Sequence, residues 1–401
     1  MNSAKTIPKE WKKVRLGDLC KINKGEQLNK LDMIENGEYP ALNGGIGPSG
    51  YTDRWNTEAN TITISEGGNS CGYINFNKQR FWCGGHCYAI KEIRKDVDRD
   101  FLYQSLKSRQ DDIMRLRVGS GLPNIQKRGI EDFPLLIPPI NEQTKISEIL
   151  SSVDSEIEKV DQEIKKTEEL KRGLMAELLT KGIGHTKFKK TKLGEIPESW
   201  EAIKLQNSGI DLLDGDRGIN YPKQDEFYTK EYCLFLSNKN IKDDRFIFDE
   251  CMFITKEKDR LLRKGKLQRN DIVLTTRGTV GNVAYYNDSV PFENIRINSG
   301  MLILRHGKKF DPLFLYKLLS SQIMKQKYKD MGSGSAQPQL PISSLKNINI
   351  PLIPLDEQKK IAKIISDIDS KIDVNKQIKN KFAELKKGLM QDLLSGKRRI
   401  I

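Results

Sequence analysis

The chain has 401 residues and a formal net charge of +14, and its length favours two or three domains over a single core. It contains no apolar run near the ~20 residues that a membrane-spanning helix needs, and its first residues lack the apolar stretch of a secretory signal. We therefore expect a cytoplasmic protein. The basic charge favours a polyanionic partner, and on charge alone both nucleic acid and an acidic membrane surface stay open.

The first part of the chain carries strand signals and most of the cysteines. Residues 60–76, "NTITISEGGNSCGYINF", predict a strand, a glycine turn and a second strand. Cys83, His86 and Cys87 follow within five residues in "FWCGGHCYA", and Cys71 is the nearest candidate for a fourth metal ligand. We interpret the cysteines as free thiols packed in a sheet, with no bound metal and no disulfide framework.

A long amphipathic helix is predicted over residues 139–179. Pro139 precedes it, Asn141 is placed as the N-cap and Gly182 as the stop signal. About 39 helical residues would make a rod on the order of 58 Å long. Apolar residues at alternating spacings of three and four predict the seam of a coiled coil, formed by Leu150, Val153, Ile157, Val160 and Ile164.

The second half follows the same plan after a Gly- and Lys-rich break at residues 180–195. Residues 270–286 again predict strand, glycine turn and strand, and residues 295–305 predict one further strand. Each body is expected to end in a short helix, over residues 101–117 and 314–329. The fold class that follows is mixed α+β.

An internal repeat explains this parallel. At a constant offset of 215, residues 139–179 align without a gap to residues 354–394, and 20 of the 41 positions are identical. The second helix has Asp356 as its predicted N-cap, and its seam contains Ile365, Ile368, Ile372 and Phe382. Each half thus reads as an entry segment, a divergent body and a long helix, and each helix is the natural partner of the other.

Two short segments repeat as well. Gly119-Ser120-x-x-Pro123 matches Gly334-Ser335-x-x-Pro338 at the offset of 215, and we expect a hairpin at both places. The entry segment "IPKEWKKVRL" from Ile7 matches "IPESWEAIKL" from Ile196. Repeated helices with divergent bodies are typical of a protein in which a rigid spacer, like a ruler, holds two separate recognition bodies, the readers, at a fixed distance.

Catalytic motifs are missing from the sequence. It has no Walker-type phosphate loop, no H-E-x-x-H pair and only three histidines, which leaves few candidates for acid–base catalysis. Asp211, Asp214 and Asp216 lie close together in "DLLDGD", and a metal-dependent nuclease is the alternative that this cluster keeps open. Asp-Gly is also a common turn. A coiled-coil adaptor without a DNA role is a third hypothesis.

Together, "IPxxW", Gly-Ser-x-x-Pro, and the helices that open with "IPPINEQTKI" and "IPLDEQKKI" and end with "LKRGLM" and "LKKGLM" resemble the specificity subunit of type I restriction–modification systems. The resemblance covers essentially the whole chain. It implies two α/β target-recognition domains and two long helices packed as an antiparallel coiled coil. The expected segments are recognition domain 1 (1–138), helix 1 (139–182), a linker (183–194), recognition domain 2 (195–353) and helix 2 (354–401).

The same resemblance implies a non-catalytic role. Each recognition domain reads one half of an asymmetric, bipartite site in double-stranded DNA, and the helices set the spacing and dock two modification subunits. Those subunits bind S-adenosylmethionine and methylate adenine, and restriction subunits that use ATP and Mg²⁺ join them. This chain itself would carry no cofactor and touch no membrane. The expected subunit-interface residues are those of the two seams, Leu150, Val153, Ile157, Val160, Ile164, Ile365, Ile368, Ile372 and Phe382.

Residue type indicates the candidate DNA contacts, since Lys and Arg bind phosphates and loop-borne Arg, Asn, Gln, Ser and Thr read base edges. For each of them a solvated or turn-capping role is the alternative. In the first body they are Lys24, Asn43, Asn69, Ser70, Asn124 and Gln126. In the second body they are Arg217, Lys239, Asn240, Arg277, Thr279, Gln337 and Gln339.

Overall fold

The computed structural model describes residues 8–119, 121–332 and 339–400. The chain divides into two compact units, the first made of Met1–Glu163 with Asn375–Ile401 and the second of Ile164–Val374. Each unit therefore contains one body and a segment of both long helices. The first unit is built from two separate parts of the chain, because the C-terminal part of the second long helix belongs to it.

Both predicted long helices are confirmed, as α4 (Ile140–Lys181) and α9 (Leu355–Leu393). The predicted N-caps are wrong. The carbonyl of Pro139 accepts hydrogen bonds from the backbone N–H groups of Glu142 (2.9 Å) and Gln143 (3.1 Å), which puts Asn141 inside the first turn. The carbonyl of Pro354 does the same in α9, and Asp356 likewise lies in its first turn. Each helix thus begins directly after its proline.

The two helices run antiparallel in both units, and ion pairs define their register. In the first unit Lys386 binds Asp154 at 2.6 Å and Lys379 binds Asp161. In the second unit Lys171 binds Asp369 at 2.6 Å. In all three pairs the two residue numbers add to 540, so the helices pair in the same register in both units.

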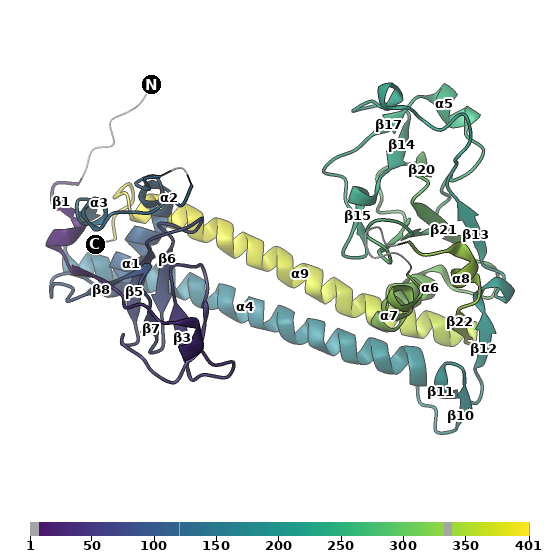
Figure 1. Ribbon diagram of the computed structural model, residues 1–401, viewed down its shortest axis with the longest axis horizontal. Helices are drawn as coiled ribbons and strands as arrows, with labels where there is room; N and C mark the ends of the chain where they lie inside the picture. The colour runs from purple at the N-terminus through teal and green to yellow at the C-terminus, as the bar shows by residue number, and fades with distance from the viewer. Residues whose placement is uncertain (1–7, 120, 333–338, 401) are drawn as a thin grey trace. The chain divides into compact units, whose positions relative to one another are not determined.

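The body of the first unit contains a four-stranded antiparallel sheet in the order β2-β8-β5-β6 and a three-stranded sheet in the order β4-β3-β7. A separate ladder joins β1 to β9, the strand that leads into α4. The short helices α1, α2 and α3 belong to the same body (Figure 1). The elements are β1 (Lys12–Arg15), β2 (Lys21–Lys24), β3 (Tyr39–Leu42), β4 (Gly50–Thr52), β5 (Thr61–Ser65), β6 (Ile74–Asn77), β7 (Trp82–Cys83), β8 (Cys87–Lys91), α1 (Arg99–Ser108), α2 (Gln110–Met114), α3 (Lys127–Glu131) and β9 (Pro134–Ile137).

The body of the second unit repeats this plan, with a four-stranded sheet in the order β13-β21-β18-β19, a three-stranded sheet in the order β17-β14-β20 and a β12–β22 ladder ahead of α9. Its elements are β12 (Glu201–Lys204), β13 (Asp211–Asp214), β14 (Cys233–Leu236), β15 (Ile241–Lys242), β16 (Arg245–Phe246), β17 (Phe253–Ile254), α5 (Lys256–Leu261), β18 (Ile272–Thr275), β19 (Val283–Tyr285), β20 (Ile295–Ile297), β21 (Met301–Arg305), α6 (Pro312–Leu319), α7 (Gln322–Met331), α8 (Ile342–Lys346) and β22 (Asn349–Leu352).

The strand pairs predicted around the two glycine turns are confirmed as β5–β6 and β18–β19. Residues 295–305 form two strands rather than one, because a turn at Asn298, whose side chain accepts the N–H of Gly300 at 2.8 Å, sends β20 and β21 into different sheets. The predicted short helices are each broken in two, as α1 with α2 and α6 with α7.

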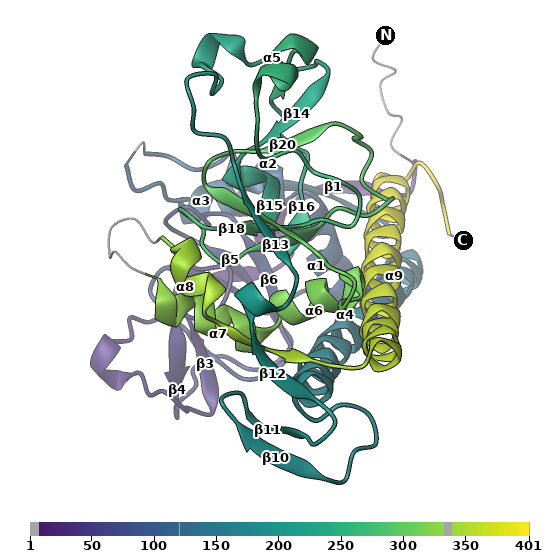
Figure 2. The same cartoon turned by 90° about the vertical axis from the view of Figure 1, so that its right-hand side faces the viewer.

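The linker between the halves contains a β-hairpin that the sequence did not predict. It consists of β10 (Phe188–Thr191) and β11 (Gly194–Pro197), paired antiparallel, and follows the end of α4 (Figure 2). Ile196 of this hairpin is 2% exposed and belongs to the core of the second unit. The linker is therefore part of the packed structure of that unit.

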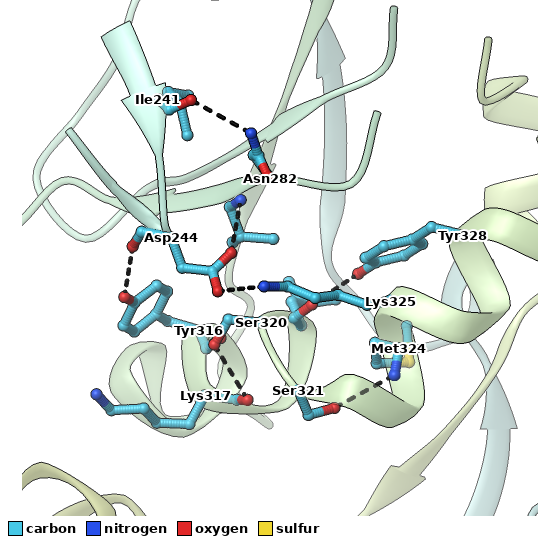
Figure 3. Close-up of polar contacts among 12 residues, drawn as sticks. Ile241, Asp244, Asn282, Tyr316, Lys317, Ser320, Ser321, Met324, Lys325 and Tyr328 are labelled. Carbon is cyan, nitrogen blue, oxygen red and sulfur yellow. Dashed lines mark hydrogen bonds and ion pairs between the residues drawn. The ribbon is translucent and has the colours of Figure 1, made fainter. Parts of the chain in front are cut away.

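A second hairpin of this unit, β15–β16, is held on α6 and α7 through Asp244 at its tip (Figure 3). Lys325 binds the Asp244 carboxylate at 2.5 Å, and the Tyr316 hydroxyl donates to the Asp244 carbonyl at 2.7 Å.

Each unit also has its own large apolar core, around Phe101 and Leu150 in the first and around Trp200 and Phe314 in the second. Among the described residues, no helix is long and apolar enough to cross a membrane.

Candidate nucleic-acid interface

A carboxylate at the start of each long helix, buried in Glu142 and largely buried in Glu357, ties the entry segment of its unit to that helix. In the first unit Glu142, 4% exposed, accepts hydrogen bonds from the Trp11 indole (3.1 Å) and from the Arg399 guanidinium (2.7 and 2.9 Å). Burial raises the pKa of the Glu142 carboxyl, but the hydrogen bonds from Arg399, Trp11 and the Ile400 N–H outweigh it and leave that pKa below its usual value. The last residues of the chain thus help to hold its beginning.

The second unit repeats this arrangement with different partners. Glu357 accepts hydrogen bonds from the Trp200 indole (3.0 Å) and the Ile183 N–H (3.0 Å), and lies 2.8 Å from the His185 Nε2. Trp11 and Trp200 come from the repeated "IPxxW" segments. The repeated tryptophan and glutamate therefore form one structural device, present once in each unit.

The glutamine that follows each glutamate fixes the short helix of its body. Gln143 accepts the N–H of Asp98, the N-cap of α1, at 2.8 Å. Gln358 accepts the N–H of Asp311, the N-cap of α6, also at 2.8 Å. Both glutamine side chains are fully buried. The repeated Glu-Gln pair thus orients each body relative to the helix segments of its own unit.

The turn between β5 and β6 gathers the candidate DNA-binding residues of the first body. Backbone pairing joins Gly67 to Asn124. The Ser70 hydroxyl donates to the carbonyl of Gly44, the residue that follows Asn43, at 2.7 Å. Asn69 lies exposed in the same turn. Four candidates from three separate segments of the sequence thus meet around one turn, and exposed Gln126 lies two residues beyond Asn124.

The ammonium of Lys24 is held beside this turn. It binds Glu66 at 2.6 Å, and the Glu66 side chain is only 7% exposed. The Tyr88 hydroxyl donates to the same carboxylate at 2.9 Å, and its pKa is raised by burial and by this hydrogen bond. Lys24 itself is half exposed, so its charge is positioned by a buried anion while it still faces solvent.

In the second body the turn between β18 and β19 is built the same way. Backbone pairing joins Arg277 to Gln339, at the places that Gly67 and Asn124 take in the first body. Arg277 and Thr279 are exposed, and the Asn238 side chain donates to the Arg277 carbonyl at 2.5 Å. Arg277, Thr279 and Gln339 are therefore brought together.

Three other candidates of the second body have different surroundings. Arg217 binds Asp214 at 3.1 Å and the Ser299 carbonyl at 3.3 Å, and Lys239 binds Glu250 at 2.9 Å on an exposed surface. Asn240 is 2% exposed. Its carbonyl group accepts from the Ser237 N–H and its amide donates to two backbone carbonyls, those of Ile247 and Glu250.

The prediction that Asn240 contacts DNA is therefore wrong. Its side chain caps a turn, because all of its polar atoms form hydrogen bonds inside the protein. Gln337 and the second Gly-Ser-x-x-Pro segment lie outside the described residues.

Asn238 was not among the residues predicted from the sequence. It lies against the Arg277 turn, and its buried Oδ1 has no hydrogen-bond partner within the described part of the chain. The run of polar residues in "LSNKN" was the signal that could have found it.

The helix seam is only partly available to another protein. Leu150 and Ile365 are 0% exposed in the cores of their own units, and Ile164 and Ile372 are also buried, which corrects their assignment to a subunit interface. Val153, Ile157, Val160, Ile368 and Phe382 are half-buried.

Other apolar residues of the helices face solvent instead, and they occur at matched positions of the repeat. Leu170 and Leu385 are 56% and 50% exposed, and Ile149 and Ile364 are both 37% exposed. Each pair is separated by the repeat offset of 215. Their presence in both copies is visible in the sequence, where Ile149 matches Ile364 and Leu170 matches Leu385.

The aspartates behind the nuclease alternative do not form a metal site. Asp216 is buried and accepts the backbone N–H groups of Gly218 (2.8 Å) and Arg263 (2.7 Å), which lower the pKa of its carboxyl. Asp214 binds Arg217, and Asp211 lies in β13. The described residues contain no group of three His, Cys, Asp or Glu side chains placed to hold a metal ion.

The cysteines are free thiols, and all but Cys251 are buried. Burial raises the pKa of the Cys20 and Cys233 thiols to about 12, and the pKa of Cys83 is raised by its hydrogen bond with Cys87 and by burial. Such thiols stay protonated at neutral pH and are poor metal ligands and nucleophiles.

Comparison with known proteins places this arrangement in a family. The model of the type I restriction modification DNA specificity domain matches residues 8–169 and 197–383. The chain is 29% identical to the type I restriction enzyme MjaVIII specificity subunit of Methanocaldococcus jannaschii, over 98% of this chain and 94% of that protein. It is 25% identical to a putative type I specificity subunit of Mycoplasma pneumoniae over 96% of both chains.

A solved structure shares the fold. The crystal structure of a type I restriction–modification system S subunit from M. genitalium covers 98% of both chains with a TM-score of 0.65 and 23% identity. The family model matches twice, once on each unit's body and adjoining helix, which agrees with the repeated devices found in the two units. The chain belongs to the family of type I restriction–modification DNA specificity subunits, which are non-catalytic.

Proposed function

We propose that this chain reads an asymmetric, bipartite site in double-stranded DNA, with the β5–β6 turn reading one half and the β18–β19 turn the other. One observation supports this above all: both turns have the same backbone pairing, with Gly67 to Asn124 in one and Arg277 to Gln339 in the other, but carry different side chains. A common frame with different polar groups on it is what two readers of unlike half-sites need.

The proposed base and phosphate contacts are those that the structure leaves accessible. In the first unit they are Lys24, Asn43, Asn69, Ser70, Asn124 and Gln126. In the second unit they are Arg217, Lys239, Arg277, Thr279 and Gln339. Asn238 supports this turn from inside, since its side chain donates to the Arg277 carbonyl.

The proposal includes the rest of the complex. Two modification subunits dock on the long helices, bind S-adenosylmethionine and methylate adenine, and restriction subunits add ATP- and Mg²⁺-dependent cleavage. The exposed apolar pairs Ile149 with Ile364 and Leu170 with Leu385 support two docking events, because each position exists once per helix. This chain holds none of these cofactors itself and acts on cytoplasmic DNA.

The direct test is methylation mapping across the genome of a host without other methyltransferases, with this chain co-expressed with the modification subunit of the same system. The expected result is methylated adenine in a site with two unlike short halves and a fixed gap. A soluble complex that adds no methylation would contradict the proposal. Purified chain that cleaves DNA with a metal ion, and loses this activity on Asp214→Ala, would support the nuclease instead.

A binding measurement separates the reader from an adaptor. For the complex bound to a DNA duplex that contains the mapped site, the affinity should fall steeply with salt, because bound phosphates release counterions. Arg277→Ala should weaken binding and reduce the salt slope by about 1 if it contacts a phosphate, or relax one base position if it reads a base. Binding that ignores salt would favour the adaptor.

A further inference from the structure

A groove of about 770 Å³ lies between α1, β9 and the C-terminal part of α9 in the first unit. We call it the α1–α9 groove. Its floor is apolar, with Leu135, Leu136, Met390 and Leu394. Its remaining lining residues are Ser105, Lys107, Ser108, Arg109, Ala383, Lys386, Lys387, Gln391 and Ser395.

The second unit has the same groove, but part of this chain fills it. Leu179 and Thr180 match Leu394 and Ser395 at the repeat offset of 215, and all four line the corresponding spaces. Pro351 likewise matches Leu136, and Leu318 matches Ser105 at the offset of 213 that relates α1 to α6. The remaining space there is only about 110 Å³.

The filling element is the β10–β11 hairpin. Lys192, Leu193 and Ile196 line the residual space, and Ile196 belongs to the apolar core. Ile196 and Pro197 of β11 are also the first two residues of the entry segment "IPESW", whose counterpart in the first half opens with Ile7 and Pro8. An extended segment that inserts two aliphatic side chains is therefore an occupant that a groove of this shape demonstrably accepts.

The lining of the α1–α9 groove differs from its counterpart in charge. It carries four cationic residues, Lys107, Arg109, Lys386 and Lys387, and no carboxylate. Two of them already bind acids outside the lining, Arg109 to Asp112 and Lys386 to Asp154, which leaves a positive surplus. Lys107 stands where the second unit has Ser320, and burial lowers the pKa of its ammonium to about 8.

A hairpin with the lysines of β10–β11 would add positive charge to a lining that is already positive. An occupant with carboxylates would instead gain charge complementarity.

A buried polar group in the groove also lacks a partner. The Ser105 hydroxyl is 6% exposed as a residue, lines the groove, and has no hydrogen-bond partner among the described residues. A buried hydroxyl without a partner is unfavourable, and an occupant with a carboxylate or carbonyl oxygen would supply the acceptor. Its counterpart in the filled groove is the apolar Leu318, which needs none.

We propose that the α1–α9 groove docks a segment of a partner protein that carries aliphatic side chains flanked by carboxylates. Among the described residues the groove is open only in the first unit, because the β10–β11 hairpin closes its counterpart in the second. The inference does not depend on the proposed DNA recognition, since no candidate DNA contact lines the groove.

The test measures the binding of fluorescein-labelled peptides to the full chain by anisotropy. The basic probe is residues 188–197, and the acidic probe is the same peptide with Lys189→Glu, Lys190→Glu and Lys192→Glu. We expect the acidic probe to bind at least about tenfold more tightly and the difference to shrink with salt. Equal affinities, or no binding of either probe up to about 1 mM, overturn the proposal.

Protein variants locate the binding. Ala383→Trp fills the groove from an exposed position of α9 and should weaken the acidic probe at least about tenfold. Ser105→Ala should weaken it by roughly three- to tenfold through the lost hydrogen bond. Lys381→Gln, on the same helix but outside the lining, is the matched control and should leave the affinity unchanged. Unchanged binding to Ala383→Trp overturns the assignment to this groove.

Two other occupants have their own outcomes. If removal of residues 1–7 raises probe affinity about tenfold, the chain's own beginning competes for the groove and the partner is excluded. If the chain self-associates and Ala383→Trp abolishes this, the occupant is a second copy. Either result overturns the proposal of a partner segment.

Discussion

Adding one heptad to both long helices is predicted to widen the gap between the half-sites and to leave each half-site unchanged. The insertions belong after Glu163 in α4 and after Val374 in α9, at the boundary between the units. Seven residues lengthen a helix by about 10.5 Å, which corresponds to roughly three base pairs of DNA. A heptad also keeps the apolar seam nearly in phase.

The register of the ion pairs explains why both helices have to change. If only α4 is lengthened, α4 has to slip by seven residues along α9 in one of the two units. The apolar seam tolerates this slip, but Lys171 then loses Asp369, or Lys386 loses Asp154. Asp369 keeps Lys317, which binds it at 2.5 Å within the same unit. The loss is therefore limited to one partly exposed ion pair, which is worth about 1 kcal/mol.

Thermal unfolding and methylation mapping of the two variants measure these effects. We expect the matched variant to melt close to the wild type and to methylate the same two halves with a gap wider by about three base pairs. The single-helix variant should melt at a temperature lower by roughly 2–4 °C, using about 2–4 °C per kcal/mol. A folded matched variant with an unchanged gap, or with altered half-sites, would refute the view that the helices set the spacing.

Three further outcomes follow from the contacts of single residues. Asp369→Asn should destabilise the second unit by about 2–4 kcal/mol in urea unfolding, because it leaves the buried Lys317 ammonium without its partner charge. Adding Lys317→Gln to the same protein should recover most of the loss. A double variant as unstable as the single one would mean that the buried charge is not the cause. Glu142 has a lowered pKa in the folded protein, so its contribution is complete above the unfolded pKa and is lost as the pH falls through the folded pKa. The melting temperature should accordingly drop less between about pH 5 and pH 3 for Glu142→Gln than for the wild type, and equal drops would contradict this assignment. Thr279→Ala should relax or weaken one half-site by about 1–3 kcal/mol while the other half stays as stringent, and mapping that shows both halves altered would argue against separate readers.

Much of the scaffold was predictable, because the repeat doubles its signal. The identity of 20 positions over 41 predicted both long helices, and the glycine turns predicted β5–β6 and β18–β19. Glycine is required there: Gly72 and Gly281 both have positive φ, 86° and 92°, and a Cβ at Gly72 would lie 2.8 Å from the backbone of Met114. Local chemistry of this kind can be read without the rest of the fold.

The errors came from features that depend on distant residues. The β10–β11 hairpin was read as a linker because its lysines and glycine suggest a solvated loop, whereas Ile196 is buried by helices far along the chain. Asn240 looked like a polar reader until its buried hydrogen bonds showed a cap. The seam residues Leu150 and Ile365 were expected to face another subunit, but the bodies of their own units cover them.

The two copies also serve as an internal comparison that separates support from recognition. Where both units need the same geometry, the residue is the same, as in Glu142 and Glu357 or Gln143 and Gln358. The partners of those carboxylates differ, with Arg399 in one unit and His185 in the other, because they come from a chain end and from a linker.

At the proposed reading turns the pattern is reversed, since the backbone pairing is the same and the side chains are not. The buried carboxylate of Glu66 that holds Lys24 has Thr276 as its counterpart, and the next residue is Gly67 in one turn and Arg277 in the other. The same backbone geometry therefore carries different side chains in the two units. Exchange of the residues on one turn should change one half-site only, because the repeated glutamate and glutamine that position each body lie elsewhere.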